Sequence, residues 1–247
     1  MKYILNQMNP GTQLSCVEIG GSSIETVLFG PGDAVERVDG ALRPDGSRLA
    51  IACPGLIGDG RVLGATNLGW FDVDPAEALH LGESAEVLLN DAEAAALGEA
   101  ALRGVSDLVF VCVGTGVGGA VVAGRQVVAG NLLGHTDGFS EEVCSCGRVG
   151  CLETVAAGWA LPEPLTNADI DRIARALAAA LVRESTAAGK LVVIGGGIAK
   201  RYSSLCERLA QHAPDRKIEP SAAPPAFKSA AAWGLRQALE SSSVMQS

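Results

Sequence analysis

The amino-acid sequence predicts an α/β protein built from two similar halves. Short apolar runs rich in Val and Ile, which are typical of buried strands, each end at a glycine or a Pro-Gly pair. Four runs have this form: 15–19, 49–53, 108–113 and 191–194. Stretches of helical character follow or separate them, at 91–103, 168–188 and 227–239. Strands that alternate with helices in this way are typical of α/β folds.

The composition indicates a folded chain and excludes several classes of partner. Of the 247 residues, 48% are hydrophobic and 19% are charged, which is enough apolar material for a packed core. The net charge of −9 and the absence of a basic run argue against nucleic-acid binding. No apolar run approaches the roughly 20 residues that span a bilayer, and the N-terminus lacks a signal-peptide stretch. We therefore expect a cytoplasmic protein without nucleic-acid or membrane partners.

The two halves each contain a strand, a glycine turn and a second strand. The first such segment covers residues 16–29, the second covers residues 110–123, and we expect a hinge after residue 90. Glycine lets backbone N–H groups converge on an anion. Neither turn matches a P-loop or a dinucleotide fingerprint. With a third glycine run at 195–197, the pattern predicts phosphate binding, with a nucleotide held between two lobes.

Asn90, Asp91 and Glu93 lie where an expected strand gives way to a helix. One interpretation is that they only cap the helix, because Asn and Asp are good N-caps and a first-turn Glu favours the helix dipole. The other is that Asp91 accepts a proton from a substrate hydroxyl as that oxygen attacks a phosphoryl group. The spacing alone leaves both interpretations open.

Three of the seven cysteines are crowded together near a histidine. His135, Cys144, Cys146 and Cys151 would complete a tetrahedral zinc shell. No protein position would remain open on such an ion, so we expect it to be structural rather than hydrolytic. The other cysteines, at 16, 53, 112 and 206, are expected to be small buried hydrophobes.

Several motifs in the chain occur together. Residues 144–153 read Cys-x-Cys-Gly-x-x-Gly-Cys-x-Glu. Further motifs are Pro54-Gly55, Asn67-Leu68-Gly69-Trp70, Asn90-Asp91-Ala92, and the glycine-rich segments 114–119 and 195–197. In this combination the chain resembles the ROK family of sugar kinases and related repressors. The resemblance implies the two-lobed actin-like ATPase (ribonuclease H-like) fold, here with a shortened N-terminal lobe and a structural zinc loop.

The resemblance also implies lobes and roles for individual residues. The N-terminal lobe would comprise residues 1–90, completed by a helix at 227–243, and the C-terminal lobe residues 91–226. Asp91 would be the general base, and His135 with the three cysteines of the cluster would hold structural Zn²⁺. The substrate ligands would be Gly55, Asn67, Asn90, Asp91, His135 and Glu153. The residues for ATP and Mg²⁺ would be Glu18, Gly20, Gly21, Ser22, Gly114, Thr115, Gly116, Gly196 and Gly197.

Three departures from the family pattern bear on the activity. The first phosphate motif, Asp-x-Gly-Gly-Thr-Lys, begins here with Glu18 and ends with Ser23, so its lysine is lost. The family's Glu-x-Gly-His motif begins here with Leu132, which cannot accept a hydrogen bond from a sugar hydroxyl. The helix-turn-helix of the repressor branch has no room before the first strand, so a DNA-binding role is not expected.

Two functions follow from these observations. The first is ATP-dependent phosphorylation of a hydroxyl on a hexose, amino sugar or sugar-like cyclitol. The alternative is a catalytically silent sugar-binding or regulatory protein, which the lost Asp, Lys and Glu of the motifs would explain. Because members of the family are often dimers or tetramers, the resemblance also implies a homodimer or homotetramer.

Overall fold

The computed structural model describes residues 13–31 and 34–244. The chain divides into two compact units. The first unit comprises residues 1–104 and 223–247, and the second unit comprises residues 105–222. We expected no signal peptide at the N-terminus, but that stretch falls within residues 1–12, which lie outside the described residues. None of the described helices is long and apolar enough to cross a membrane.

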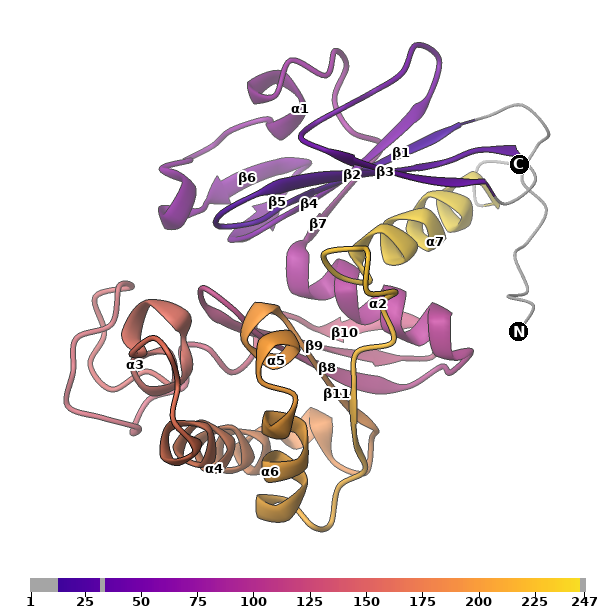
Figure 1. Ribbon diagram of the computed structural model, residues 1–247. Coiled ribbons are helices and arrows are strands. Elements are labelled where there is room, and N and C mark those ends of the chain that lie inside the picture. Colours follow the sequence, from indigo (N-terminus) through magenta and orange to yellow (C-terminus); the bar gives the residue numbers. More distant parts are fainter. Residues whose placement is uncertain (1–12, 32–33, 245–247) are drawn as a thin grey trace. The chain divides into compact units, whose positions relative to one another are not determined.

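The first unit is built on a mixed five-stranded sheet with the strand order β3-β2-β1-β4-β7 (Figure 1). A small antiparallel pair, β5 and β6, accompanies it. The strands are β1 (Leu14–Ile19), β2 (Ile24–Phe29), β3 (Val35–Asp39), β4 (Arg48–Cys53), β5 (Leu56–Gly58), β6 (Arg61–Gly64) and β7 (Val87–Asn90). The helices are η2 (Thr66–Leu68), α1 (Pro75–Ala78), α2 (Asp91–Arg103) and α7 (Ala231–Val244).

The second unit is built on another mixed five-stranded sheet, with the order β10-β9-β8-β11-β12. Its strands are β8 (Leu108–Val113), β9 (Val117–Ala123), β10 (Gln126–Ala129), β11 (Val192–Gly195) and β12 (Ile218–Pro220). Its helices are α3 (Glu153–Ala156), η3 (Gly158–Ala160), α4 (Asn167–Arg183), η4 (Ser185–Ala187), α5 (Gly197–Arg201) and α6 (Ser204–His212).

The two sheets repeat one topology. In each, three antiparallel strands in sequence are followed by two parallel ones: β1 pairs antiparallel with β2 and parallel with β4, and β8 pairs antiparallel with β9 and parallel with β11. The prediction of an α/β fold with two similar halves is therefore confirmed. The repeat also places the β1–β2 turn and the β8–β9 turn at equivalent positions of their sheets.

In the first unit, α2 and α7 pack against each other at very close range. A Cβ on Gly98 of α2 would lie 1.8 Å from the carbonyl oxygen of Ala230, and a Cβ on Gly234 of α7 would lie 1.9 Å from that of Ala94. Only glycine allows such an approach of two backbones. On the sheet, Phe29 is fully buried and its ring meets Trp233 of α7 edge to face, with centroids 5.9 Å apart.

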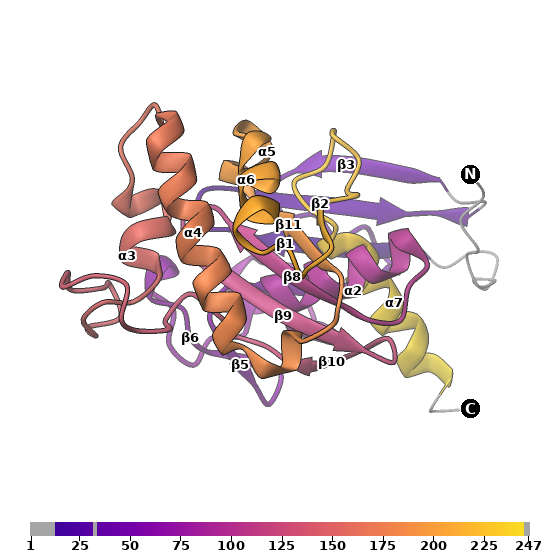
Figure 2. The same ribbon diagram turned by 90° about the horizontal axis from the view of Figure 1, so that it is seen from below.

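In the second unit, α4 and α6 lie side by side against one face of the sheet (Figures 1 and 2). The core between them is formed by fully buried aliphatic side chains, among them Val111, Ile173, Leu177 and Leu205. Helix α4 begins with a capping box in which Thr166 and Asp169 bond each other's backbone amides. This helix packs against the sheet, and the β8–β9 turn lies at the end of the two strands that it joins.

Several expected boundaries differ in the structure. The last helix begins at Ala231 rather than at residue 227, because Ser229 Oγ accepts a hydrogen bond from the Ala231 amide (2.9 Å) and caps the first turn. Strand β9 begins at Val117, so Gly119 lies within the strand and only residues 114–116 form the turn. The two compact units divide after Gly104, with α2 in the first unit against α7.

Candidate functional site

The β1–β2 turn is a tight glycine hairpin in the first unit. The Gly20 amide donates a hydrogen bond to the Ser23 carbonyl oxygen (2.9 Å), and Gly21 and Ser22 stand exposed at the tip. Glu18 on β1 precedes the turn and is buried, with only 8% of the residue exposed. The three predicted nucleotide residues at the tip and the predicted carboxylate below them are thus brought together by one hairpin.

Two residues from the segment before α7 reach this hairpin. Lys228 Nζ donates to the Ser23 carbonyl oxygen (3.1 Å) and lies 3.8 Å from Glu18 Oε1. Ser229 Oγ donates to Glu18 Oε2 (2.7 Å). Burial raises the pKa of the Glu18 carboxyl to about 7, although Lys228 and Ser229 both act to lower it. The hairpin therefore carries one buried acid with a lysine and a serine beside it.

Asp91 lies where β7 ends and α2 begins, with Asn90 as the helix N-cap. Asn90 accepts a hydrogen bond from the Ala92 amide (2.9 Å) through Oδ1 and donates one to the Gly55 carbonyl oxygen (3.0 Å) through Nδ2. The Ala92 amide also lies 2.9 Å from Asp91 Oδ1. Burial raises the pKa of Asp91, against the opposing effects of the Ala92 amide and the Lys228 charge. Capping thus accounts for Asn90, whereas Asp91 is a half-buried carboxylate of raised pKa.

Two further predicted substrate ligands belong to the first unit, Asn67 and Gly55. Asn67 is in the short helix η2 and is exposed. Gly55, with φ +105°, is pressed against β6, since a Cβ there would lie 2.2 Å from the Gly64 carbonyl oxygen. Of these two, only Gly55 is tied to the Asn90–Asp91 corner by a hydrogen bond.

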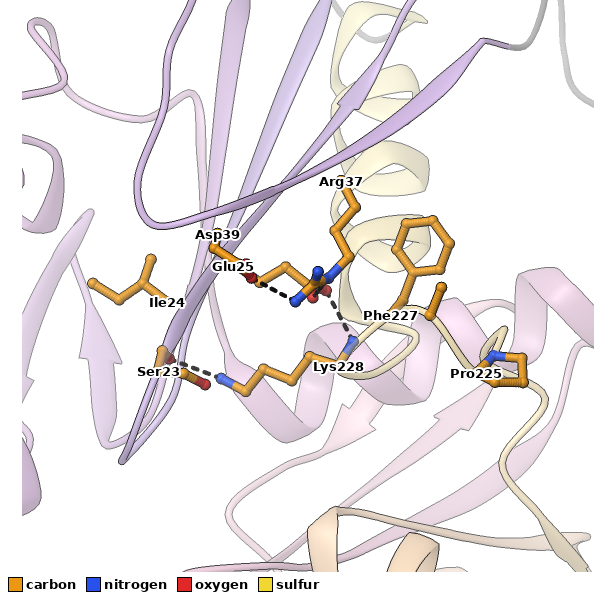
Figure 3. A pocket seen from close by; sticks show the side chains of 9 residues that line it. Ser23, Ile24, Glu25, Arg37, Asp39, Pro225, Phe227 and Lys228 are labelled. Carbon is orange, nitrogen blue, oxygen red and sulfur yellow. Dashed lines mark hydrogen bonds and ion pairs between the residues drawn. The ribbon is translucent and has the colours of Figure 1, made fainter.

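A cavity of about 300 Å³ opens beside the hairpin, between β2, β3 and the segment before α7 (Figure 3). Arg37 pairs with Glu25 and Asp39 along one wall. Glu25 Oε1 also accepts a hydrogen bond from the backbone amide of Lys228 (2.9 Å). The Lys228 side chain runs from this wall to Ser23 at the turn, as Figure 3 shows.

In the second unit, the predicted glycine segments come together. The β8–β9 turn is closed by a hydrogen bond from the Gly114 amide to the Gly116 carbonyl oxygen (2.9 Å). A Cβ on Gly114 would lie 3.7 Å from the Gly197 amide nitrogen, and a Cβ on Gly196 would lie 2.5 Å from the Val113 carbonyl oxygen. Thr115 is exposed at the turn. The two groups of residues that the resemblance assigns to ATP in this unit, 114–116 and 196–197, are therefore neighbours.

Glu153 supports the same turn from α3. Its Oε1 accepts a hydrogen bond from the Val117 amide (2.8 Å), and its Oε2 accepts one from Trp159 Nε1 (3.4 Å). A Cβ on Gly116 would lie 2.6 Å from Glu153 Oε1. The Glu153 amide in turn donates to the Gly134 carbonyl oxygen (3.0 Å), next to His135.

The four predicted zinc ligands form one cluster. The ligand atoms of His135, Cys144, Cys146 and Cys151 all lie within 4.8 Å of one another. Cys144 Sγ is 3.7 Å from His135 Nδ1, and Cys146 Sγ is 3.7 Å from Cys151 Sγ. A tetrahedral zinc with Zn–S and Zn–N distances near 2.3 and 2.0–2.1 Å places its ligand atoms about 3.5–3.8 Å apart. The donor set and its spacing therefore fit zinc.

The loop around the cluster is shaped by two glycines with positive φ. Gly147 (φ +85°) follows Cys146, and its amide donates to the Cys144 carbonyl oxygen (2.8 Å). Gly150 (φ +76°) precedes Cys151, and a Cβ there would lie 2.5 Å from the Ser140 carbonyl oxygen. With four protein ligands, a bound zinc would fix this loop and leave no open position for a reacting molecule.

The comparisons with known proteins identify the family. Residues 32–168, more than half of the chain, match the profile of the ROK family. The chain belongs to the ROK family. It is 34% identical over 212 aligned residues to the N-acetylmannosamine kinase of Escherichia coli O9:H4 (strain HS), covering 71% of this chain and 73% of that one. The predicted family and its carbohydrate-kinase class are thereby confirmed.

Solved ROK structures share the fold. The ROK hexokinase from Thermus thermophilus superposes with a TM-score of 0.71 at 22% identity, covering 93% of this chain and 100% of that chain. A ROK family glucokinase from Streptomyces griseus, solved in complex with glucose and AMPPNP, gives a TM-score of 0.72 at 18% identity, over 92% and 98% of the two chains. The predicted ROK fold is confirmed.

Lys228 and Ser229 were not among the predicted site residues. They follow the Pro/Ala-rich loop at 220–225 and belong to no motif of their own. The one signal that could have found them is indirect. The ROK phosphate motif ends in lysine, this chain has Ser23 there, and a positive charge at the hairpin would then have to come from another part of the chain.

Proposed function

We propose that this ROK protein transfers the γ-phosphoryl group of ATP to a hydroxyl of a hexose, an amino sugar such as N-acetylmannosamine, or a related cyclitol. The 34% identity to an N-acetylmannosamine kinase over most of both chains supports an amino sugar in particular. The observation that carries the proposal is the half-buried Asp91 carboxylate where β7 ends, next to Asn90, with a raised pKa.

Asp91 is the general base of this proposal. Its carboxylate takes the proton from the sugar hydroxyl as the hydroxyl oxygen attacks the γ-phosphorus, the bond to the β–γ bridging oxygen breaks, and ADP leaves. The raised pKa makes the Asp91 carboxylate a better proton acceptor than an exposed one. The Lys228 charge, which acts to lower that pKa, helps to keep it ionised.

The sugar ligands of the proposal are Gly55, Asn67, Asn90, His135 and Glu153. Asn90 donates its amide hydrogen to Gly55, which holds both residues at the corner where Asp91 begins α2. Leu132 replaces the Glu of the family motif, so a hydroxyl directed at it would lose a partner at a cost of about 1–3 kcal/mol if buried. This favours a substrate without a free hydroxyl at that point.

The nucleotide ligands of the proposal are the two glycine turns, residues 20–22 and 114–116, together with Gly196 and Gly197. Their backbone amides suit phosphate oxygens. Mg²⁺ binds proteins through one or two carboxylates and keeps several waters and phosphate oxygens. Glu18 offers the one carboxylate that such a partly hydrated ion needs; its Oε2 accepts from Ser229 and its Oε1 lies 3.8 Å from Lys228 Nζ. When bound, Mg²⁺ neutralises developing phosphate charge.

A second candidate function is a catalytically silent sugar-binding regulator. The observations that favour it are the replaced motif residues: Glu18 for Asp, Ser23 for Lys and Leu132 for Glu. It differs from the kinase in one measurable respect, because it predicts stabilisation by a sugar without any release of ADP.

The experiment measures ADP release over a panel of hexoses, amino sugars and cyclitols with Mg-ATP, alongside thermal shifts with the same compounds. The kinase predicts ADP release that depends on one class of sugar. Replacing the base in Asp91→Asn should then lower kcat at least about 100-fold. Glu93→Gln is the matched control, since it neutralises a second carboxylate in the first turn of α2. Thermal stabilisation without turnover, or an Asp91→Asn enzyme with wild-type kcat, would contradict the proposal.

A further inference from the structure

The first glycine hairpin carries a lysine that is supplied from the other end of the chain. Lys228 Nζ lies directly over Gly20, since a Cβ at Gly20 would fall 1.9 Å from it. The same nitrogen donates to the Ser23 carbonyl oxygen (3.1 Å), the oxygen that closes the turn by accepting from the Gly20 amide. The end of the lysine side chain is therefore in direct contact with the turn, and it would have to move if residue 20 had a Cβ.

The base of this side chain is held in place. The Lys228 amide donates to Glu25 Oε1 (2.9 Å), and Glu25 is itself paired with Arg37 (Figure 3). The neighbouring Ser229 is bonded to Glu18 (2.7 Å). Two carboxylates on β1 and β2 thus anchor the segment that presents the ammonium group to the turn.

The ammonium group remains within reach of a ligand. The side chain of Lys228 is 27% exposed and lies beside the exposed tip residues Gly21 and Ser22. Its Nζ lies 3.8 Å from Glu18 Oε1 and 3.1 Å from the Ser23 carbonyl oxygen, so the charge is held at the turn itself. A lysine is a compact point charge that suits phosphate oxygens.

We propose that Lys228 contacts a phosphate group of the bound nucleotide, replacing in space the lysine that is missing from the phosphate motif at Ser23. This inference rests on the proposed function, because it takes the ligand of the hairpin to be a nucleotide. Lys228 would then be a nucleotide-binding residue outside the phosphate motif, supplied by the segment before α7.

The test uses the full-length protein and Mg-ADP and Mg-ATP as probes. Lys228→Met should weaken Mg-ADP binding in calorimetry, and raise KM for ATP, by about tenfold or more. The KM for the sugar should change by less than about threefold. Lys228→Arg should keep most of the nucleotide affinity. Adding Ser23→Lys to Lys228→Met should recover part of it, because the new lysine starts from the turn itself.

Lys217→Met is the control for the loss of a positive charge. Lys217 is an exposed lysine paired with a glutamate, Glu219, in the second unit. Its loss should leave Mg-ADP affinity unchanged. Unfolding temperatures of all variants separate binding from folding. If Lys228→Met lowers the unfolding temperature but leaves Mg-ADP affinity intact, Lys228 is only structural and the inference fails.

The two proposals fail in different ways. A wild type that binds Mg-ADP but releases none from ATP with any sugar contradicts the kinase, while the loss of Mg-ADP affinity in Lys228→Met still supports the role of Lys228. Sugar-dependent turnover with unchanged nucleotide affinity and KM in Lys228→Met supports the kinase and overturns the role of Lys228. A wild type without measurable Mg-ADP binding overturns both.

Discussion

Glu153 accepts a hydrogen bond from the amide of Val117, 2.8 Å from its Oε1, and so holds the β8–β9 turn against α3. Its own amide donates to the Gly134 carbonyl oxygen (3.0 Å), next to the predicted zinc ligand His135. One residue of the cysteine motif therefore connects the zinc loop with the glycine turn. These two hydrogen bonds give Glu153 a structural role in addition to the sugar-binding role proposed for it.

We expect Glu153→Ala to destabilise the protein by about 1–3 kcal/mol, because it removes a charged acceptor and leaves the buried Val117 amide without it. The free energy of unfolding from urea denaturation measures this. Glu142→Ala, which removes an exposed carboxylate from the zinc loop, is the control and should have little effect. Equal stabilities of the two variants would contradict the structural role.

Cys146→Ser should lower both the zinc content and the thermal stability. Metal analysis of the wild type should find about one zinc per chain, since four protein ligands complete a tetrahedral shell. Cys206→Ser, outside the cluster, should keep its zinc. A metal-free wild type of full stability, or a Cys146→Ser protein with unchanged zinc, would show that the cluster is not a zinc site.

Glu18 should make the stability of the protein depend on pH. Its pKa is raised from 4.5 to about 7 in the folded chain, so between these values the folded state holds a proton that the unfolded chain releases. The stability that Glu18 contributes is present below pH 4.5 and falls as the pH rises to 7. Since one pKa unit corresponds to about 1.4 kcal/mol, the fall is no more than about 3 kcal/mol.

Glu18→Gln should remove this fall. The groups that face Glu18 are Lys228, Ser229, Asp91 and Glu25, all of which the variant keeps. Urea denaturation from pH 4.5 to 8, without nucleotide or magnesium, compares the slopes of the two proteins. Parallel slopes would mean that Glu18 does not hold its proton in the folded state.

Gly98→Ala should destabilise the first unit although alanine favours helices. The new Cβ would fall 1.8 Å from the Ala230 carbonyl oxygen, so α2 and α7 would have to move apart at a cost of about 1–3 kcal/mol. Ala101→Gly, at an exposed position of the same helix, measures the helix preference alone, about 1 kcal/mol. A more stable Gly98→Ala protein would contradict the close packing of the two helices.

Local pattern accounts for much of what could be predicted. The bounds of β8 and α2 agree with the expected segments, because the apolar pattern and the capping residues that define them lie within a few residues of each other. The start of α7 could not be found in this way. It depends on Ser229, whose hydroxyl accepts from the Ala231 amide while it donates to Glu18, 211 positions away in the chain.

The sequence alone predicted the four candidate zinc ligands and the glycine turns, because each set lies within a short stretch of chain whose turns glycine makes possible. Only the tertiary structure decided which charge stands at the first turn. Lys228 and Ser23 are 205 positions apart, and they meet because the segment before α7 is anchored on β1 and β2 by Glu18 and Glu25. A contact of that separation depends on how the helix packs on the sheet, and no local pattern carries that information.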